Sequence, residues 1–303
     1  MFWIRLRSSV ILVIAALFLL LMGGWVLAAG LFVLSLVAFW ELMRAASAGG
    51  QEQSPAKEQT AGKGKASEQG KSVEGTSLGR GRFGPLMWIG LIGTAAWYAA
   101  LLLGAQPVYW FGVLGLVFLG MMAAYVITFP ALQAGQVMTA FFSFFYGPVL
   151  FSFIWLTREL PGGVYMVWLI FISSWICDTC AYLSGMALGK HKLTPVLSPK
   201  KSVEGAVGGV LGSALVGVLF GYFLLNRIFA GQNMTWISAL ICGAGAVISQ
   251  IGDLAASGIK RNHGIKDYGK LIPGHGGVMD RFDSVLFTAP IIYYLAILLI
   301  RFE

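Results

Sequence analysis

Long apolar runs, each about the length needed to cross a bilayer, follow one another along most of this chain. A transmembrane helix needs roughly 20 predominantly apolar residues. Because lipid offers no partners for backbone N–H and C=O groups, such runs fold as helices. The sequence therefore predicts an all-α polytopic membrane protein with about nine transmembrane helices. The expected spans are 8–22, 25–44, 86–103, 109–127, 137–156, 164–188, 205–225, 235–257 and 284–300.

Charge is sparse and positive. Only 11% of the residues are charged, 57% are hydrophobic, and the net charge is +8. A nucleic-acid surface needs a concentrated basic face, so we expect no nucleic-acid partner. Thinly spread lysine and arginine residues are instead typical of cytoplasmic loops that contact anionic membrane lipids.

Composition divides the chain into four parts. The first apolar run does not stop at Gly23 as a signal peptide would, so residues 1–44 are interpreted as a retained helix pair. Residues 45–84 are rich in Gln, Gly, Ser and Lys, which predicts a flexible cytoplasmic linker. We expect residues 85–163 to form central transmembrane helices, and residues 164–303 to form a transmembrane domain with cytoplasmic loops, which is the catalytic part if the chain is an enzyme.

Counting spans from a cytoplasmic N-terminus puts three charged segments on the same side. These are the linker, the loop 189–204 and the stretch 250–284, and the lysine and arginine bias agrees with this placement. Asp178 and Asp253 lie near the cytoplasmic ends of their helices, where they can converge with Asp280 and Asp283. The expected site is at the cytoplasmic interface.

The stretch 250–284 carries the strongest chemical signal. Asp280 and Asp283 are three residues apart, so they share a face if the chain after Gly277 is helical, with Arg281 turned aside. Paired carboxylates, completed by substrate phosphates, are typical of a Mg²⁺ site. The segment 273–277 has little side-chain bulk, so its N–H groups could approach phosphate oxygens. The alternative is a loop that only fixes topology, but such a loop does not need carboxylates within apolar helices.

The loop 189–204 is a second candidate. Hydroxyls and cations before an apolar helix make a workable anion site, although a topology-setting loop also fits. Its candidate residues are Ser198, Lys200, Lys201, Ser202 and Glu204. The three cysteines, two of them in Cys177-x-x-Cys180, and the glycine pairs of span 205–225 are interpreted as helix-packing residues.

Three motifs together resemble the phosphatidate cytidylyltransferases, also called CDP-diacylglycerol synthases. The longest is S257-x2-K260-R261-x4-K266-D267-x5-P273-G274-H275-G276-G277-x2-D280-R281-x-D283. The other two are W175-x2-D178-x2-A181-Y182-x2-G185 and S198-P-K-K-S-x-E204-G205. Ser202 stands where the family usually has Thr, and Gly258 where a bulkier residue is common. The resemblance covers the C-terminal half, from about Trp175 onward.

The resemblance implies an enzyme of phospholipid biosynthesis in a bacterial inner membrane, and a homodimer. It would convert CTP and phosphatidic acid to CDP-diacylglycerol and pyrophosphate, with Mg²⁺ and a second cation such as K⁺. Asp253, Asp280 and Asp283 would be metal ligands. Lys200, Lys201, Lys266 and Arg281 would hold phosphates, and Asp178 would support the site or bind metal. His275 would donate to a phosphate or shape its loop, Lys260 and Arg261 would hold a lipid headgroup or anchor the interface, and Ser198, Ser202, Glu204, Gly276 and Gly277 would bind substrate.

Two other functions remain open from the sequence. A CTP-dependent enzyme acting on another lipid, such as an ether-lipid cytidylyltransferase or a polyprenol kinase, would share paired carboxylates at the membrane. A transporter would also bury carboxylates, but it should show broken helices in both halves, whereas the unusual charges here lie in the C-terminal half.

Overall fold

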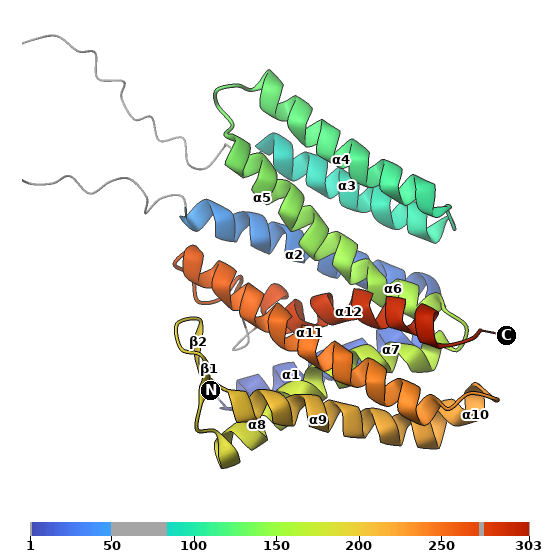
Figure 1. The fold of residues 1–303 in the computed structure, drawn as a ribbon. Coiled ribbons are helices and arrows are strands. Elements are labelled where there is room, and N and C mark those ends of the chain that lie inside the picture. Colours follow the sequence, from blue (N-terminus) through green and yellow to red (C-terminus); the bar gives the residue numbers. More distant parts are fainter. Residues whose placement is uncertain (1, 50–83, 273–275, 303) are drawn as a thin grey trace, which may run out of the picture.

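The computed structural model describes residues 2–49, 84–272 and 276–302. Within them, nine helical segments run back and forth between two ends of the molecule (Figure 1). Six segments are continuous: α1 (Phe2–Met22), α2 (Gly24–Gly49), α3 (Gly84–Leu102), α4 (Pro107–Ile127), α11 (Met234–Asn262) and α12 (Met279–Leu299).

The other three segments each contain a five-residue π-helical turn. A π turn shifts the register of the side chains that follow it, and such turns are frequent at functional sites. The composite segments are α5 (Ala134–Phe144), η1 (Phe145–Val149) and α6 (Leu150–Glu159); α7 (Gly163–Phe171), η2 (Ile172–Ile176) and α8 (Cys177–Leu188); and α9 (Val203–Phe220), η3 (Gly221–Leu225) and α10 (Asn226–Ile228).

Length and hydropathy make this an integral membrane protein. Within the described ranges, eight helical segments are long and apolar enough to cross a membrane, and α1 has a shorter apolar part, Ile11–Met22. Many large apolar side chains point outward, such as Phe111 at 73% exposed and Leu103 at 80%. Lipid can cover such surfaces, since they need no water. The predicted all-α polytopic class is confirmed.

Helix ends differ from the expected span ends at the charged end of the molecule. α11 continues to Asn262, and α12 begins at Met279, before the expected 284. Hydropathy reports where a helix leaves the apolar layer, whereas the hydrogen-bonded helix extends further into polar surroundings. Asp253 and Lys260 therefore lie on α11, and Asp280 and Asp283 lie on α12.

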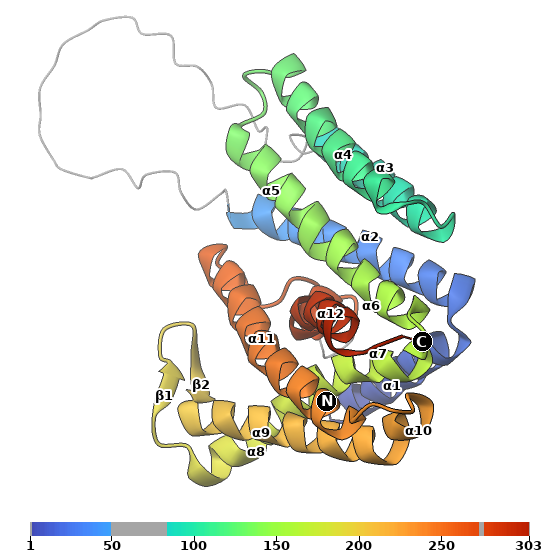
Figure 2. The same cartoon turned by 45° about the vertical axis from the view of Figure 1, so that its right-hand side comes forward.

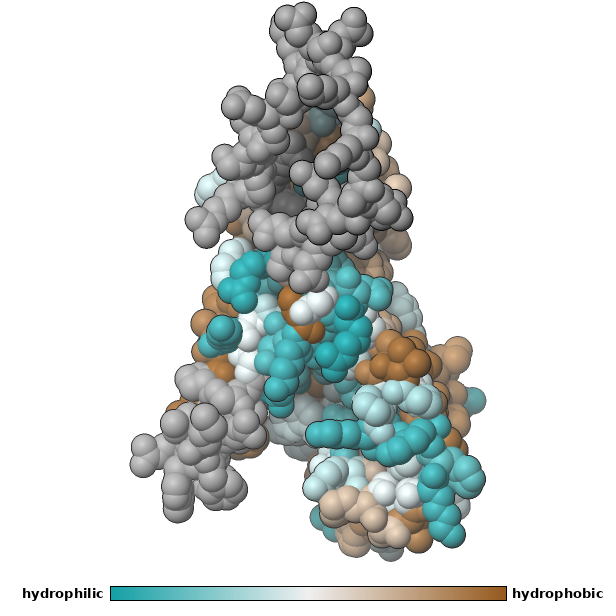
Figure 3. Space-filling model, turned by 90° about the vertical axis from the view of Figure 1, so that its left-hand side faces the viewer, coloured by the Kyte–Doolittle hydropathy of each residue, from teal (hydrophilic) through white to brown (hydrophobic). Residues whose placement is uncertain are grey.

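The charged segments gather at one end. The end of α2, the start of α3, the connection between α8 and α9 and the connection between α11 and α12 all lie toward the left of Figure 1. Viewed from that side, the molecule shows hydrophilic residues gathered over these elements (Figure 3). Residues 50–83, most of the predicted linker, lie outside the described residues.

The loop 189–204 is more ordered than expected. It holds an antiparallel hairpin of β1 (Lys192–Thr194) and β2 (Ser198–Ser202), with Lys192 opposite Ser202 and Thr194 opposite Ser198. Strands of three and five residues are too short for a periodicity signal, and hydrophilic composition alone predicted a loop.

α12 lies in the middle of the molecule. It packs against α11, α6, α7 and α2, as seen nearly end-on in Figure 2. Leu286, Ala289 and Ile292 are fully buried on it. The first turn of this central helix is consequently surrounded by elements from both halves of the chain.

Glycines allow α8, α9 and α11 to approach closely. A Cβ on Gly208 or Gly212 would collide with Ser184 or Cys180 of α8, and one on Gly217 would meet the Ser238 carbonyl of α11. Their interpretation as helix-packing residues is therefore confirmed. The three cysteines are free thiols, and Cys177 and Cys242 are buried.

Candidate active site

Asp280 and Asp283 occupy the first turns of α12, as expected for a helix that begins just after Gly277. Both carboxylates are largely buried, at 9% and 8% exposed, while Arg281 between them is exposed. Their environments nevertheless differ: Asp280 accepts three hydrogen bonds from the protein, whereas Asp283 accepts one and is more open to a ligand.

Asp280 holds the loop that precedes it. Its Oδ2 accepts hydrogen bonds from the backbone N–H groups of Tyr268 at 2.8 Å and Gly277 at 3.0 Å. Its Oδ1 accepts from Lys260 Nζ at 2.9 Å. Metal binding through Oδ1 would have to compete with Lys260.

Tyr268, which sequence analysis did not single out, supports this arrangement. The residue is 1% exposed, its hydroxyl donates to the Ala256 carbonyl at 3.0 Å, and Lys260 Nζ lies 5.4 Å from the centroid of its ring. Burial, together with the nearby carboxylates of Asp283 and Asp280, raises the pKa of the Tyr268 phenol. The phenol therefore remains a protonated donor.

Asp283 belongs to a second group of carboxylates. It interacts electrostatically with Asp253 on α11 and with Asp178 on α8. Its Oδ1 accepts one hydrogen bond, from the Ser284 N–H at 2.8 Å. The structure thus brings together three carboxyl groups from three helices, with Lys260, Lys201 and Arg281 near them, which is an arrangement suited to binding a cation.

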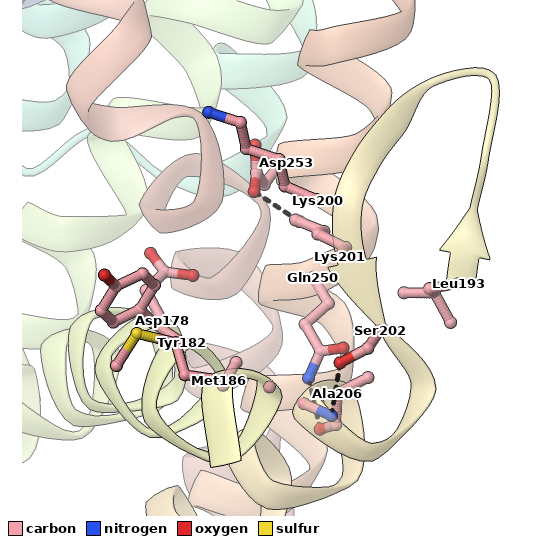
Figure 4. A pocket seen from close by; sticks show the side chains of 13 residues that line it. Asp178, Tyr182, Met186, Leu193, Lys200, Lys201, Ser202, Ala206, Gln250 and Asp253 are labelled. Carbon is pink, nitrogen blue, oxygen red and sulfur yellow. Dashed lines mark hydrogen bonds and ion pairs between the residues drawn. The ribbon is translucent and has the colours of Figure 1, made fainter. Parts of the chain in front are cut away.

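A cavity of about 360 Å³, which we call the hairpin cavity, separates Asp178 from the β1–β2 hairpin (Figure 4). Lys201 reaches across from β2 and forms an ion pair with Asp253. Gln250 lines the cavity and joins α11 to α9, because its Nε2 donates to the Ala206 carbonyl at 3.0 Å. The remaining lining residues include Tyr182, Met186, Lys200 and Ser202.

The chain's own side chains hold the hairpin in place. Ser202 caps α9, since its Oγ accepts a hydrogen bond from the Gly205 N–H at 3.1 Å. The Glu204 carboxylate accepts from the backbone N–H groups of Lys190 at 3.1 Å and His191 at 3.2 Å, and also pairs with the His191 ring. Both residues therefore shape the loop and carry Lys200 and Lys201 to the cavity.

A second cavity, of about 250 Å³, lies beside the first and shares Asp178 with it; we call it the aspartate cavity. Asp280, Arg281 and Asp283 line it, and Arg281 interacts electrostatically with Asp178. Part of its wall comes from α1, at residues 12, 13 and 16. The two cavities join the charged hairpin to the start of α12.

The other predicted residues lie around this centre. Ser198 is half-buried on β2, whereas Arg261 and Lys266 are exposed. Gly277 gives its N–H to Asp280, so a phosphate could take that donor only by displacing the carboxylate. Gly276 has φ +87°, and a Cβ there would approach Asp280 Oδ2 at 2.8 Å. His275 lies outside the described residues.

Glu41 on α2 was missed. It is 1% exposed, and its two carboxylate oxygens accept hydrogen bonds from the backbone N–H groups of Val278 at 3.1 Å and Met279 at 2.9 Å. The signal was present in the sequence, because a carboxylate within an apolar run singled out Asp178 by the same reasoning. What the sequence lacks is any indication of its partner.

The donor set suits a hard divalent cation. Within the described residues, no three Asp, Glu, His or Cys side chains form a ready-made metal cage. Mg²⁺ does not need one, since it is usually held by one or two carboxylates together with substrate phosphates and water. Asp253 and Asp283 offer carboxylate oxygens beside cavities large enough for such a substrate.

Comparison with known proteins agrees with this chemistry. Residues 74–299 match the model of the cytidylyltransferase family, so the likeness begins well before Trp175 and includes the central helices. The phosphatidate cytidylyltransferase of Staphylococcus saprophyticus is 41% identical over 147 residues, which are 48% of this chain and 54% of that protein. Those of Staphylococcus haemolyticus and Staphylococcus aureus are 39% and 41% identical over 147 and 148 residues, with the same shares covered. The chain spans about half the length of these curated relatives. Because the family model covers more than half of the chain, this protein belongs to the cytidylyltransferase family.

Proposed function

We propose that this protein is a CTP:phosphatidate cytidylyltransferase of a bacterial cytoplasmic membrane, with its site facing the cytoplasm. Family membership and the names of the relatives support the reaction type and the two substrates. The position of the site, at the end of membrane-spanning helices, suits a water-soluble nucleotide that must meet a lipid headgroup.

The reaction needs little proton transfer. An anionic phosphate oxygen of phosphatidate attacks the α-phosphorus of CTP and forms a new P–O bond. The bond between the α-phosphorus and the oxygen that bridges it to the β-phosphorus breaks. CDP-diacylglycerol and pyrophosphate result, and the electron pair of the broken bond leaves on pyrophosphate. The protein's task is therefore to position two anions and to neutralise their charge.

Basic side chains on two elements would hold the phosphates. Lys200 and Lys201 line the hairpin cavity from β2, and Arg281 lines the aspartate cavity from α12. Lys201 is already drawn toward the carboxylates by its ion pair with Asp253. We assign the CTP triphosphate to the hairpin lysines and the lipid phosphate to Arg281, with Lys266 as a further phosphate contact.

Asp253 and Asp283 would hold Mg²⁺ together with substrate phosphates, and a second cation such as K⁺ would sit beside it. Asp280 would bind the metal through its Oδ1 once Lys260 has moved away from that oxygen. Mg²⁺ bound there would neutralise charge on the phosphates and favour departure of pyrophosphate. Asp178, which lines both cavities, would keep the centre electronegative.

One observation carries this proposal. Three carboxylates from α8, α11 and α12 and a lysine from β2 converge at one end of the membrane-spanning helices, in a chain of the cytidylyltransferase family. A helix bundle with a purely structural role would have no need to gather three carboxylates there.

The test is product formation by the purified protein. We expect CTP and phosphatidate in mixed micelles to give CDP-diacylglycerol and pyrophosphate only when Mg²⁺ is present. Asp283→Asn should lower kcat by about 100-fold or more, because it removes charge at the reacting phosphates. Glu159→Gln, an exposed site at the end of α6, should match wild type. A well-folded wild-type protein without turnover on phosphatidate would overturn the substrate assignment, and ether-lipid and polyprenol acceptors would be tried next.

A further inference from the structure

Glu41 connects the second helix of the chain to the start of the last one. It lies on α2, is 1% exposed, and contacts a part of the chain more than two hundred residues away. An ionised carboxylate inside a membrane-spanning segment is costly unless its oxygens find donors. Both oxygens find them in the backbone N–H groups of Val278 and Met279.

These two N–H groups lie at the N-terminal end of α12, one on Val278 just before the helix and one on Met279, its first residue, where a helix has no internal acceptors for them. The residue preceding α12, Val278, makes no side-chain capping hydrogen bond of its own. Glu41 therefore caps α12 from another helix. Its negative charge also lies at the positive end of the helix dipole, which adds to the attraction.

The glycines next to α12 make room for this carboxylate. A Cβ on Gly269 or on Gly277 would collide with the carboxylate of Glu41, and the two glycines also lie against each other. The Glu41 carboxylate therefore packs between Gly269 and Gly277, which explains why neither position carries a side chain.

Arg44, one turn further along α2, holds the other side of the same loop. Its Nη2 donates to the Tyr268 carbonyl at 3.4 Å, and the Tyr268 N–H donates to Asp280 Oδ2 at 2.8 Å. α2 thus contacts this connection at two places, at Tyr268 and at Val278 and Met279. Asp280 directly follows the second place and accepts a hydrogen bond from the first, and Asp283 comes one turn later.

We propose that Glu41 is a positioning residue for the transfer reaction: through the start of α12 it sets where Asp280 and Asp283 stand relative to Asp253 and Asp178. This inference rests on the proposed function for its kinetic consequence. It also gives α2, far from the other site residues in the sequence, a role in the site.

Glu41→Gln and Glu41→Ala separate positioning from packing. The Gln side chain has nearly the same shape, but it keeps only one acceptor oxygen and turns an NH₂ donor toward an N–H group. If Glu41 only fills space, Glu41→Gln should match wild type and Glu41→Ala should not. We expect instead that both variants lower kcat per folded molecule by at least about 10-fold, as for small misplacements of reacting groups.

The KM for CTP should change little in these variants, since the hairpin that carries Lys200 and Lys201 packs against α8 and α9. Glu159→Gln serves as the matched control. Folded protein is counted by size-exclusion chromatography and thermal unfolding in detergent. Wild-type kcat in Glu41→Gln would overturn the proposal.

Amide hydrogen exchange provides a readout that is independent of turnover. Peptides covering 277–283 should exchange faster in Glu41→Gln than in wild type, while peptides from α9 should be unchanged. Unaltered exchange would mean that Glu41 does not hold the start of α12, which contradicts the inference whatever the substrates are. If wild type forms no CDP-diacylglycerol but exchange still rises in Glu41→Gln, the proposed function fails while the attachment of α12 stands.

Discussion

Lys260, in the last turn of α11, donates to Oδ1 of Asp280, in the first turn of α12, at 2.9 Å. The Lys260 side chain is 15% exposed and that of Asp280 is 3% exposed. This ion pair closes the connection between two helices that each carry a carboxylate of the candidate site. It therefore joins the end of α11 directly to the start of α12.

Removing Lys260 should destabilise the protein. Lys260→Met leaves a buried carboxylate with backbone donors alone, at an expected cost of about 2–3 kcal/mol. Lys270→Met, at an exposed lysine of the same connection, should cost less than about 0.5 kcal/mol. Unfolding curves of the purified variants in one detergent would measure this, and equal midpoints would show that the pair contributes nothing.

Lys201→Met should separate substrate binding from stability. The Lys201 and Asp253 side chains are 28% and 30% exposed, so their ion pair should contribute only about 0–1 kcal/mol to stability. If Lys201 holds the CTP triphosphate, losing one charged contact should raise the KM for CTP about 10-fold or more. Lys192→Met removes the same charge from an exposed position of β1 and should leave KM near wild type. Equal KM values in the two variants would remove Lys201 from the nucleotide site.

Gly269→Ala should be destabilising because of Glu41. The new methyl group would meet the Glu41 carboxylate, and overpacking of this kind typically costs about 1–3 kcal/mol. Gly112→Ala is the control: the glycine is exposed on α4 with open space at its Cβ position, so alanine there should stabilise the helix by up to about 1 kcal/mol.

A double variant sharpens the Gly269 test. Combining Gly269→Ala with Glu41→Ala removes the collision, so the double variant should lose less stability than the sum of the single losses. Simple additivity of the unfolding free energies would show that the glycine and the carboxylate do not interact.

The two ends of the molecule should lie on opposite sides of the membrane. Val196, at the hairpin turn, is 90% exposed, and Asn233 is exposed between α10 and α11 at the other end. With the charged end cytoplasmic, an impermeant maleimide should label Val196→Cys only in inside-out vesicles and Asn233→Cys only in right-side-out spheroplasts. Wild-type protein gives the background of the three native cysteines, and the reverse pattern would place the site on the outer side.

Sequence reasoning worked best where the membrane restricts the choice of structure. The spans follow from length and hydropathy alone, and the number of crossings between charged segments placed Asp178, Asp253 and Asp283 at one end. The same reasoning interpreted Gly208 and Gly212 correctly, because small residues spaced along an apolar helix have few other uses.

It was weaker where a residue depends on a distant partner. Because Gly277 has no side chain, its N–H was expected to bind phosphate. In the structure that N–H donates to Asp280, and the absence of a side chain makes room for Glu41. Ser202 and Glu204 were read as substrate ligands, and here they cap α9 and hold the turn before β1. Their substrate roles stay predictions.

Three features can be derived from the amino-acid sequence: the membrane-spanning helices, the end of the molecule at which charge collects, and the residue types of the candidate site. These follow from the cost of placing polar groups in lipid, which acts on each segment separately. The packing of the helices settles which carboxylates accept hydrogen bonds from the backbone, as Asp280 and Glu41 do, and which have few such donors, as Asp283 does. That choice depends on donors brought in from other helices, such as Lys260 for Asp280 and the start of α12 for Glu41, and no local pattern in the chain encodes those distances.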